Sequence, residues 1–224
     1  MRITIIGGAY GSGKTEFAVN YAKYLKTKNS GPIGLIDLDI VNPYFRSRDL
    51  TEQMGQEGIT VVSSELAREN VDIPALSPQI YSLLQDHSYQ VVIDMGGDAV
   101  GARALGRFNQ YFMAEPYNFW VVINPFRPDT ETADQTIKMI DNLQTAARVS
   151  ATGLVANINL GTETNLEIWH KGLSVIQEVS TQMDLPIVFQ VVEEGFLASN
   201  SDFFKAYPVF PLHLTMLPPW LDSE

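Results

Sequence analysis

The sequence contains no cysteine and only three histidines. The lack of cysteine excludes a disulfide, a thiolate nucleophile, a cysteine-ligated zinc ion and a cysteine-bound iron–sulfur cluster. The histidines, His87, His170 and His213, are scattered along the chain and do not have the spacing of a metal site. Redox functions and metal sites that are built on cysteine are therefore excluded.

Positive charge is also scarce. The chain has 15 Lys and Arg against 26 Asp and Glu, a formal net charge of −11. Non-specific binding to nucleic acid or to an anionic membrane needs a basic surface, so we expect neither as a partner. No apolar run approaches the roughly 20 residues of a membrane span, and no charged and then apolar leader opens the sequence. These features predict a cytoplasmic protein without membrane insertion.

The most informative stretch is residues 8–15, which reads GAYGSGKT and fits the pattern G-x-x-x-x-G-K-[ST]. It lies between the β-branched run Ile3–Ile6, which is typical of a buried parallel strand, and a helical pattern that begins near Phe17. Glycines let such a loop approach an anion closely, with backbone amides and the positive end of the helix facing phosphate oxygens. The stretch predicts a phosphate-binding loop; the alternative is a glycine-rich turn that binds nothing.

Two side chains of this loop have expected roles in phosphate chemistry. Lys14 would reach the β- and γ-phosphates, and Thr15 would place its hydroxyl on a magnesium ion. The loop residues that we expect to contact the nucleotide are Gly8, Gly11, Ser12, Gly13, Lys14 and Thr15.

Strands and helices alternate along the rest of the chain. Short apolar runs predict strands at 33–36, 59–62, 91–93, 119–123, 153–156 and 187–189. Apolar residues at helical spacing predict helices near 80–84, and over 100–112, 133–143 and 166–179. This alternation implies right-handed crossovers and a three-layer α/β/α fold of the P-loop NTPase type, whose mostly parallel sheet has about seven strands. We expect one domain over residues 1–224, with an irregular proline-rich tail from about residue 206.

Carboxylates follow two of the predicted strands. Asp37 and Asp39 open a polar, proline-broken segment that extends to residue 48, which is our candidate for a nucleotide-sensing loop. Asp94 ends another apolar strand, and a carboxylate at such a place can hold magnesium opposite the threonine of a phosphate loop. Gly97, three residues later, could offer its amide to a γ-phosphate. The alternative for this second segment is a strand end that turns on two glycines.

Four stretches together resemble the SIMIBI class of P-loop NTPases: GAYGSGKT, IDLDIVNP, VVIDMGG and LVAN. Within that class the chain resembles the branch that contains MinD/ParA-type ATPases, the nitrogenase iron protein, arsenite-pump ATPases and the cobyrinic acid amidoligase (CobQ/CobB-like) and dethiobiotin synthetase group. It is most similar to bacterial ATP-binding proteins of this branch that share the stretch DLDIVNPYFRSR. The resemblance covers about residues 1–195, and only the first motif is highly specific.

The resemblance implies roles for residues outside the phosphate loop. Asp39 corresponds to the carboxylate that orients or activates the attacking water, and Asp37 fits a magnesium-side or structural role. Asp94 corresponds to the Walker B aspartate, and Gly97 to the glycine that senses the γ-phosphate. Asn157 corresponds to the strand-end asparagine that reads the adenine edge. The expected catalytic residues are thus Lys14, Asp39 and Asp94, and the expected magnesium-side residues are Thr15, Asp37 and Asp94.

The chain departs from its relatives at two places. GTPase branches of the class grip guanine with N/T-K-x-D, whereas this chain has Asn157-Ile158-Asn159, which favours ATP over GTP. The second lysine that crosses to a partner's phosphates in the ATP-sandwich dimer is replaced here by Ala9. A trans-lysine mechanism is therefore unsupported, although a homodimer in which an arginine supplies that charge stays open. The arginines considered for an additional cation are Arg46, Arg48, Arg103 and Arg107.

Three functions remain open at this point. The first is a slow, Mg²⁺-dependent ATPase that acts as a switch, whose loops at 39–48 and 96–107 respond to the nucleotide and signal to a protein partner or second subunit. The second is an ATP-dependent ligase or kinase of the dethiobiotin synthetase type, in which loops 42–48 and 124–127 bind an acidic small molecule. The third is a nucleotide-binding module without catalysis.

Overall fold

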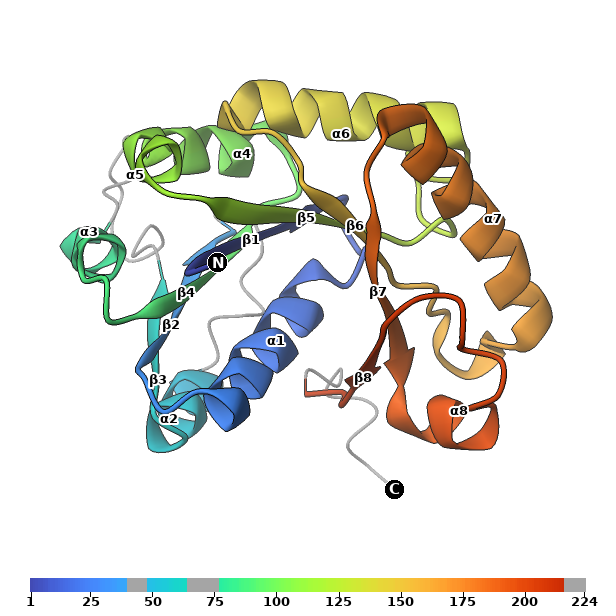
Figure 1. The fold of residues 1–224 in the computed structure, drawn as a ribbon, viewed down its shortest axis with the longest axis horizontal. Helices are drawn as coiled ribbons and strands as arrows, with labels where there is room; N and C mark the ends of the chain where they lie inside the picture. The colour runs from blue at the N-terminus through green and yellow to red at the C-terminus, as the bar shows by residue number, and fades with distance from the viewer. Residues whose placement is uncertain (40–47, 64–76, 216–224) are drawn as a thin grey trace.

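A computed structural model describes residues 1–39, 48–63 and 77–215, and it contains one eight-stranded sheet with the strand order β3-β2-β4-β1-β5-β6-β7-β8 (Figure 1). Every neighbouring pair of strands is parallel. The strands are β1 (Ile3–Gly8), β2 (Ile33–Leu38), β3 (Ile59–Ser63), β4 (Gln90–Met95), β5 (Tyr117–Ile123), β6 (Gly153–Ala156), β7 (Ile187–Glu193) and β8 (Val209–Leu212). The expected α/β fold with a parallel sheet is confirmed, with one strand more than the approximate number.

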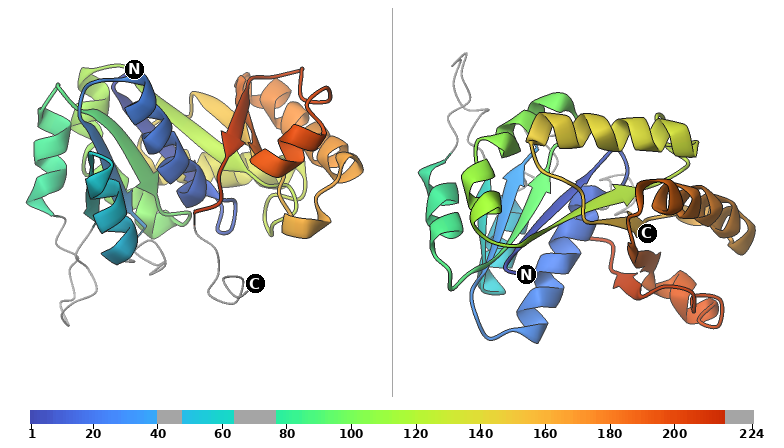
Figure 2. Two further views of the ribbon diagram at one scale, coloured as in Figure 1. Left: turned by 90° about the horizontal axis from the view of Figure 1, so that it is seen from below. Right: turned by 45° about the horizontal axis from the view of Figure 1, so that its top comes forward.

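Helices cover both faces of this sheet (Figures 1 and 2). They are α1 (Lys14–Lys28), α2 (Arg48–Gln56), α3 (Pro78–Gln85), α4 (Ala99–Gly106), α5 (Asn109–Ala114), α6 (Ala133–Ala147), α7 (Leu166–Met183) and α8 (Glu194–Ser199). One core cluster joins the sheet to α3, α4, α5, α6 and α7, and the other joins it to α1 and α2. The strands supply side chains to both clusters, as expected for a parallel sheet covered on both faces.

The helix expected over residues 100–112 is in fact two helices, α4 and α5. Gly106 ends α4, and a Cβ atom on it would lie 3.3 Å from the carbonyl oxygen of Ala147 in α6. The chain then turns at Phe108, whose side chain is fully buried. The prediction of one continuous helix was wrong because the close approach of α4 to α6 and the burial of Phe108 override the apolar spacing.

The tail that we expected to be irregular from about residue 206 contains a strand, β8, at the edge of the sheet. Its side chains alternate, with Phe210 and Leu212 buried and Pro211 exposed. Proline is tolerated on an edge strand because its missing N–H can face away from the neighbouring strand. Residues 216–224, which include the last prolines and Trp220, lie outside the described residues.

The segment after β8 is hydrogen-bonded to the first half of α1. The Nδ2 atom of Asn20 donates to the carbonyl oxygen of His213 (3.0 Å), and its Oδ1 accepts from the His213 amide (3.1 Å). The Oε1 atom of Glu16 accepts from both the amide and the hydroxyl of Thr215, each at 2.6 Å. These contacts attach the end of the sheet to the helix that follows the glycine-rich loop.

No helix in the described ranges is long and apolar enough to cross a membrane.

Candidate nucleotide-binding site

The predicted phosphate loop joins β1 to α1 at the carboxyl edge of the sheet. Gly13, immediately before α1, has φ 85°, and a Cβ atom there would lie 2.2 Å from Nδ2 of Asn157. Gly8 has φ 151°, and its Cβ atom would lie 2.4 Å from the carbonyl oxygen of Val122. Both positions require glycine for two reasons. The backbone has a positive φ at each of them, and neighbouring atoms leave no room for a Cβ atom. The loop conformation leaves the amino end of a 15-residue helix directed at the edge of the sheet.

Lys14 and Asp39 form a buried ion pair beside this loop. The Lys14 ammonium nitrogen lies 3.2 Å from Oδ2 of Asp39, and the two side chains are 4% and 7% exposed. The Asp39 amide donates to Oδ1 of Asp37 (2.8 Å), which fixes the turn that aims Asp39 back toward β1. A buried charge is stable only with such partners. The structure thus brings together three of the expected site residues.

Asp94 lies at the carboxyl end of β4, between β2 and β1. Its side chain is fully buried, and neither carboxylate oxygen has a hydrogen-bond partner among the residues that the structure describes. Burial raises the pKa of Asp94 to about 7; Lys14 and the nearby Thr15 hydroxyl oppose this increase, and the charge of Asp39 adds to it. A bound cation would compensate the charge of this fully desolvated carboxylate at the edge of the phosphate loop.

The donor set around Asp94 fits magnesium. Mg²⁺ is usually bound through one or two carboxylates together with substrate phosphates and water, rather than by a complete cage of protein ligands. Within residues 1–39, 48–63 and 77–215, no group of three or more His, Cys, Asp or Glu side chains could hold a metal ion by itself. The unpartnered oxygens of Asp94 and the Thr15 hydroxyl supply hard oxygen donors next to the predicted phosphate position.

Gly97 packs directly against the backbone of the phosphate loop. A Cβ atom on Gly97 would lie 2.7 Å from the Gly8 carbonyl oxygen and 3.0 Å from the Tyr10 amide nitrogen. Only a residue without a side chain fits at this distance from backbone atoms. Ala9, the residue in the position of the trans-acting lysine, is buried.

Asn157 contacts the loop from the other side of β1. Its Nδ2 donates to the Ser12 carbonyl oxygen (2.7 Å), while its Oδ1 and the Ser12 hydroxyl oxygen are buried with no partner in the described parts of the chain. Asn157 therefore supports the loop through its amide nitrogen and keeps one acceptor unused. The next residue, Ile158, is fully buried and has no access to a ligand at this edge.

One contact at this site was not predicted from the sequence, which indicated only that the segment 124–127 could belong to an acceptor pocket. The Nε atom of Arg127, in the turn after β5, donates to the Gly11 carbonyl oxygen (3.1 Å) across 116 residues of sequence. No motif marks such a contact; the only sequence signal is the position of Arg127 shortly after the carboxyl end of an apolar strand.

The arginines expected to supply an additional cation are not gathered at the loop. Arg103 lines a groove of about 790 Å³ between α4 and α6, which begins at Gly97 and is also lined by Lys138. Arg107 lies exposed at the end of α4. Arg46, the side chain of Arg48 and most of the predicted segment 39–48 lie outside the described residues, whereas the predicted acceptor segment 124–127 is described.

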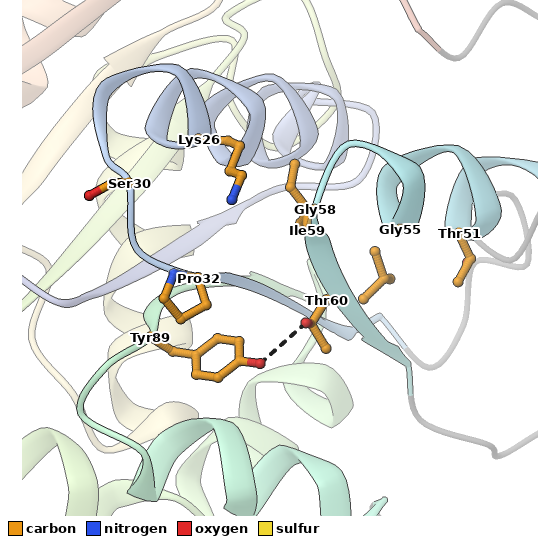
Figure 3. A pocket seen from close by; sticks show the side chains of 10 residues that line it. Lys26, Ser30, Pro32, Thr51, Gly55, Gly58, Ile59, Thr60 and Tyr89 are labelled. Carbon is orange, nitrogen blue, oxygen red and sulfur yellow. Dashed lines mark hydrogen bonds between the residues drawn. The ribbon is translucent and has the colours of Figure 1, made fainter.

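A second hollow lies beside the carboxyl end of α1 (Figure 3). It has a volume of about 640 Å³ and is lined by residues at the end of α1, in α2, at the start of β3 and just before β4, among them Lys26, Thr60 and Tyr89. Lys26 is twelve residues beyond Lys14 on α1, which places the two Cα atoms about 18 Å apart along the helix. This hollow is not part of the candidate site.

Comparisons with solved structures identify the fold. The cell division protein FtsY of Thermotoga maritima matches with a TM-score of 0.58 and 17% identity, over 86% of this chain and 62% of that protein. The signal recognition particle receptor FtsY of Elizabethkingia anophelis matches with a TM-score of 0.53 and 17% identity, over 83% of this chain and 56% of that protein. FtsY of Mycoplasma mycoides matches with a TM-score of 0.52 and 14% identity, over 84% of this chain and 59% of that protein. The chain spans about three fifths of the length of these proteins. In sequence, no family model and no curated protein matches it.

These similarities show that the chain has the fold of the SIMIBI class of P-loop NTPases. The expected fold class is confirmed on this point, and the motif-bearing residues lie at the carboxyl edge of the sheet, where open α/β sheets bind their ligands. The branch within the class, and the roles of the individual residues, stay predictions.

Proposed function

We propose that this chain is a Mg²⁺-dependent ATP-binding protein that hydrolyses ATP slowly and acts as a nucleotide-driven switch. The observation that carries the proposal is the buried set of Lys14, Asp39 and Asp94 around a glycine loop, with both oxygens of Asp94 unpartnered. ATP rather than GTP is favoured because the guanine-binding residues of the class are missing after β6. A cytoplasmic location is part of the proposal and rests on the sequence.

Each residue has a defined role in this reaction. The amides of Gly11, Ser12 and Gly13 and the amino end of α1 would hold the phosphates, with Lys14 bridging the β- and γ-phosphates. Thr15 and Asp94 would hold Mg²⁺, which neutralises charge on the phosphate oxygens when it is bound. Asp39 would position the attacking water.

The ion pair between Lys14 and Asp39 gives this mechanism a switch. Lys14 has three N–H donors, and phosphate oxygens would compete with Asp39 for them, so nucleotide binding would weaken the ion pair and shift the Asp39 side chain. Asp39 is the first residue of the predicted nucleotide-sensing segment 39–48, of which residues 40–47 lie outside the described residues. Gly97, which packs against the phosphate loop, belongs to the second predicted segment, 96–107. A γ-phosphate that contacts Gly97 would change the position of α4 through this segment. A protein partner or a second copy of the chain would respond to these segments.

The groove between α4 and α6 supports a second candidate function, an ATP-dependent ligase or kinase that acts on an acidic small molecule. Its lining includes Gly97 next to the loop and two exposed cations, Arg103 and Lys138, which have no ion-pair partner in the described residues. The carboxylates Asp98 and Asp129 line the same groove. An anionic acceptor in this groove would lie near the γ-phosphate.

Phosphate release from ATP and GTP with Mg²⁺ tests the proposal. We expect slow, ATP-selective release that is lost in Lys14→Ala through weaker binding and in Asp39→Asn with binding retained. Turnover that is unchanged in Asp39→Asn would contradict the proposed water-positioning role, and tight ATP binding without release would leave a non-catalytic module. Acceleration by a small acidic metabolite, lost in Arg103→Ala, would favour the ligase over the switch.

A further inference from the structure

The strand order divides the candidate site into two halves about β1. Asp94 at the end of β4 and Asp37 at the end of β2 lie on one side of β1, whereas Arg127 after β5 and Asn157 after β6 lie on the other. The carboxylates and the cation that they would hold belong with the terminal phosphates. A nucleotide that lies across the loop therefore directs its base toward the ends of β5 and β6.

Arg127 and Asn157 approach the loop as a pair on this second side. Arg127 donates to the carbonyl oxygen of Gly11 and Asn157 to that of Ser12, so the two side chains contact successive peptide groups. A Cβ atom on Gly11 would lie 3.6 Å from Cδ of Arg127, which shows how closely the arginine stem covers the loop.

The turn that carries Arg127 is held by several hydrogen bonds. The Asn124 side chain accepts from the Phe126 amide (3.1 Å) and donates to the Asn159 carbonyl oxygen (2.9 Å), which ties the β5 turn to the loop after β6. The Thr130 hydroxyl donates to the carbonyl oxygens of Asn124 (2.7 Å) and Arg127 (3.0 Å). The backbone on which Arg127 is mounted is therefore fixed before any ligand binds.

The guanidinium group itself remains available. Arg127 is exposed, and the one hydrogen bond that its side chain makes to the described residues runs from Nε to the Gly11 carbonyl oxygen. That bond orients a planar cation at the rim of the loop, and the other four N–H groups of Arg127 donate to none of the described residues. Guanidinium planes stack on aromatic rings, and a purine base is such a ring.

From this geometry we infer that Arg127 forms one wall of the base pocket and stacks on the purine ring of the bound nucleotide. The inference rests on the proposed nucleotide-binding function and adds to it a residue that no motif indicates. In this arrangement Arg127 determines affinity for the nucleoside part of the ligand and has no part in contacting the γ-phosphate.

Calorimetric titrations of ADP, ATP and inorganic tripolyphosphate, with Mg²⁺, test this assignment. We expect Arg127→Ala to weaken ADP and ATP binding about tenfold and to the same extent, and to leave tripolyphosphate binding within about twofold of wild type. Arg127→Lys keeps the positive charge but lacks the planar guanidinium group, so its affinity for ADP and ATP should lie between those of Arg127→Ala and wild type. Arg107→Ala, which removes an exposed arginine elsewhere, is the matched control.

The other outcomes overturn the inference in distinguishable ways. Weaker binding of ATP with unchanged ADP binding would make Arg127 a γ-phosphate ligand. Equal losses for ADP and tripolyphosphate would assign it to the phosphate loop alone, and unchanged binding in Arg127→Ala would remove it from the site. Wild-type protein that binds no nucleotide would instead refute the proposed function itself.

Discussion

Asp94 is the residue whose environment has the clearest electrostatic consequence. Its pKa rises from 3.8 to about 7 on folding, chiefly because burial disfavours the charged carboxylate. Between these pH values the folded chain holds a proton that the unfolded chain has released, so the contribution of Asp94 to stability decreases as the pH rises through this window. At higher pH the folded, ligand-free chain carries a buried, unpartnered negative charge.

The first prediction concerns Asp94→Asn in the absence of nucleotide. Asparagine cannot ionise, so we expect the variant to be more stable than wild type at about pH 8. The expected difference in the free energy of unfolding is on the order of 4 kcal/mol. The two proteins should approach each other in stability only toward about pH 4, near the unfolded pKa of 3.8. Urea denaturation across this range measures the difference, and parallel pH profiles for the two proteins would contradict the assigned pKa.

A second prediction at the same scale concerns Gly97→Ala. The new methyl group would lie 2.7 Å from the Gly8 carbonyl oxygen, a backbone atom that cannot turn away, so the phosphate loop must move. We expect nucleotide affinity to fall at least about tenfold while the fold is retained. Gly55→Ala in α2, where a Cβ atom meets nothing within 4 Å, serves as the control and should leave nucleotide affinity unchanged. Equal affinity in Gly97→Ala and wild type would remove Gly97 from the site.

At the scale of elements, α1 connects the candidate site to the end of the sheet. Its first residues, Lys14 and Thr15, belong to the site, and Glu16 and Asn20 hold the segment 213–215 after β8. Asn20 is buried and uses both ends of its amide on the backbone of His213. The placement of the edge strand thus depends partly on the helix that follows the phosphate loop.

Asn20→Ala should therefore destabilise the chain. The substitution leaves the His213 amide and carbonyl without these partners, and losing two partly buried hydrogen bonds costs about 1–3 kcal/mol. Thr27→Ala, in the last turn of the same helix with an exposed hydroxyl, should cost less than about 0.5 kcal/mol. Chemical denaturation of both variants checks the difference; equal small effects would mean that the segment after β8 contributes little to stability.

Elements were predictable from the sequence where burial alone determines them. Runs such as 33–36 and 91–93 are apolar because both faces of a central parallel strand are covered, and their strands were predicted correctly. Helix α2 was not predicted, since its sequence RDLTEQMGQ has few apolar residues, among them the buried Met54. Edge strand β8 was missed because proline spacing outweighed the alternation of Phe210 and Leu212.

The candidate site was predictable to the extent that motifs define it. The loop at 8–15 and the carboxylates after β2 and β4 could be identified because a fixed spacing accompanies phosphate binding. The ion pair between Lys14 and Asp39 and the contact from Arg127 to Gly11 could not, because each depends on how distant strands are ordered in the sheet. Side-chain pairing across 25 or more residues follows from topology, which local patterns do not encode.

At the scale of the whole molecule, the two core clusters lie on opposite faces of one sheet. Ile5 and Ile6, neighbours in β1, belong to different clusters, as do Val91 and Val92 in β4. A strand that loses its packing on one face therefore loses its place in the other cluster as well. We expect the chain to unfold as one cooperative unit, in keeping with the predicted single domain.

Nucleotide binding should stabilise that whole unit rather than a part of it. The site joins residues from β1, β2, β4 and the loops after β5 and β6, so a bound ligand holds the centre of the sheet together. A ligand at 100 times its Kd adds about 2.7 kcal/mol, which for a chain of this size raises the Tm by roughly 5–10 °C. Calorimetric scans with Mg²⁺ and ATP should show a single transition that moves upward, with no shift in Lys14→Ala. Two separate transitions, of which the ligand moves only one, would instead divide the chain into independently folding parts.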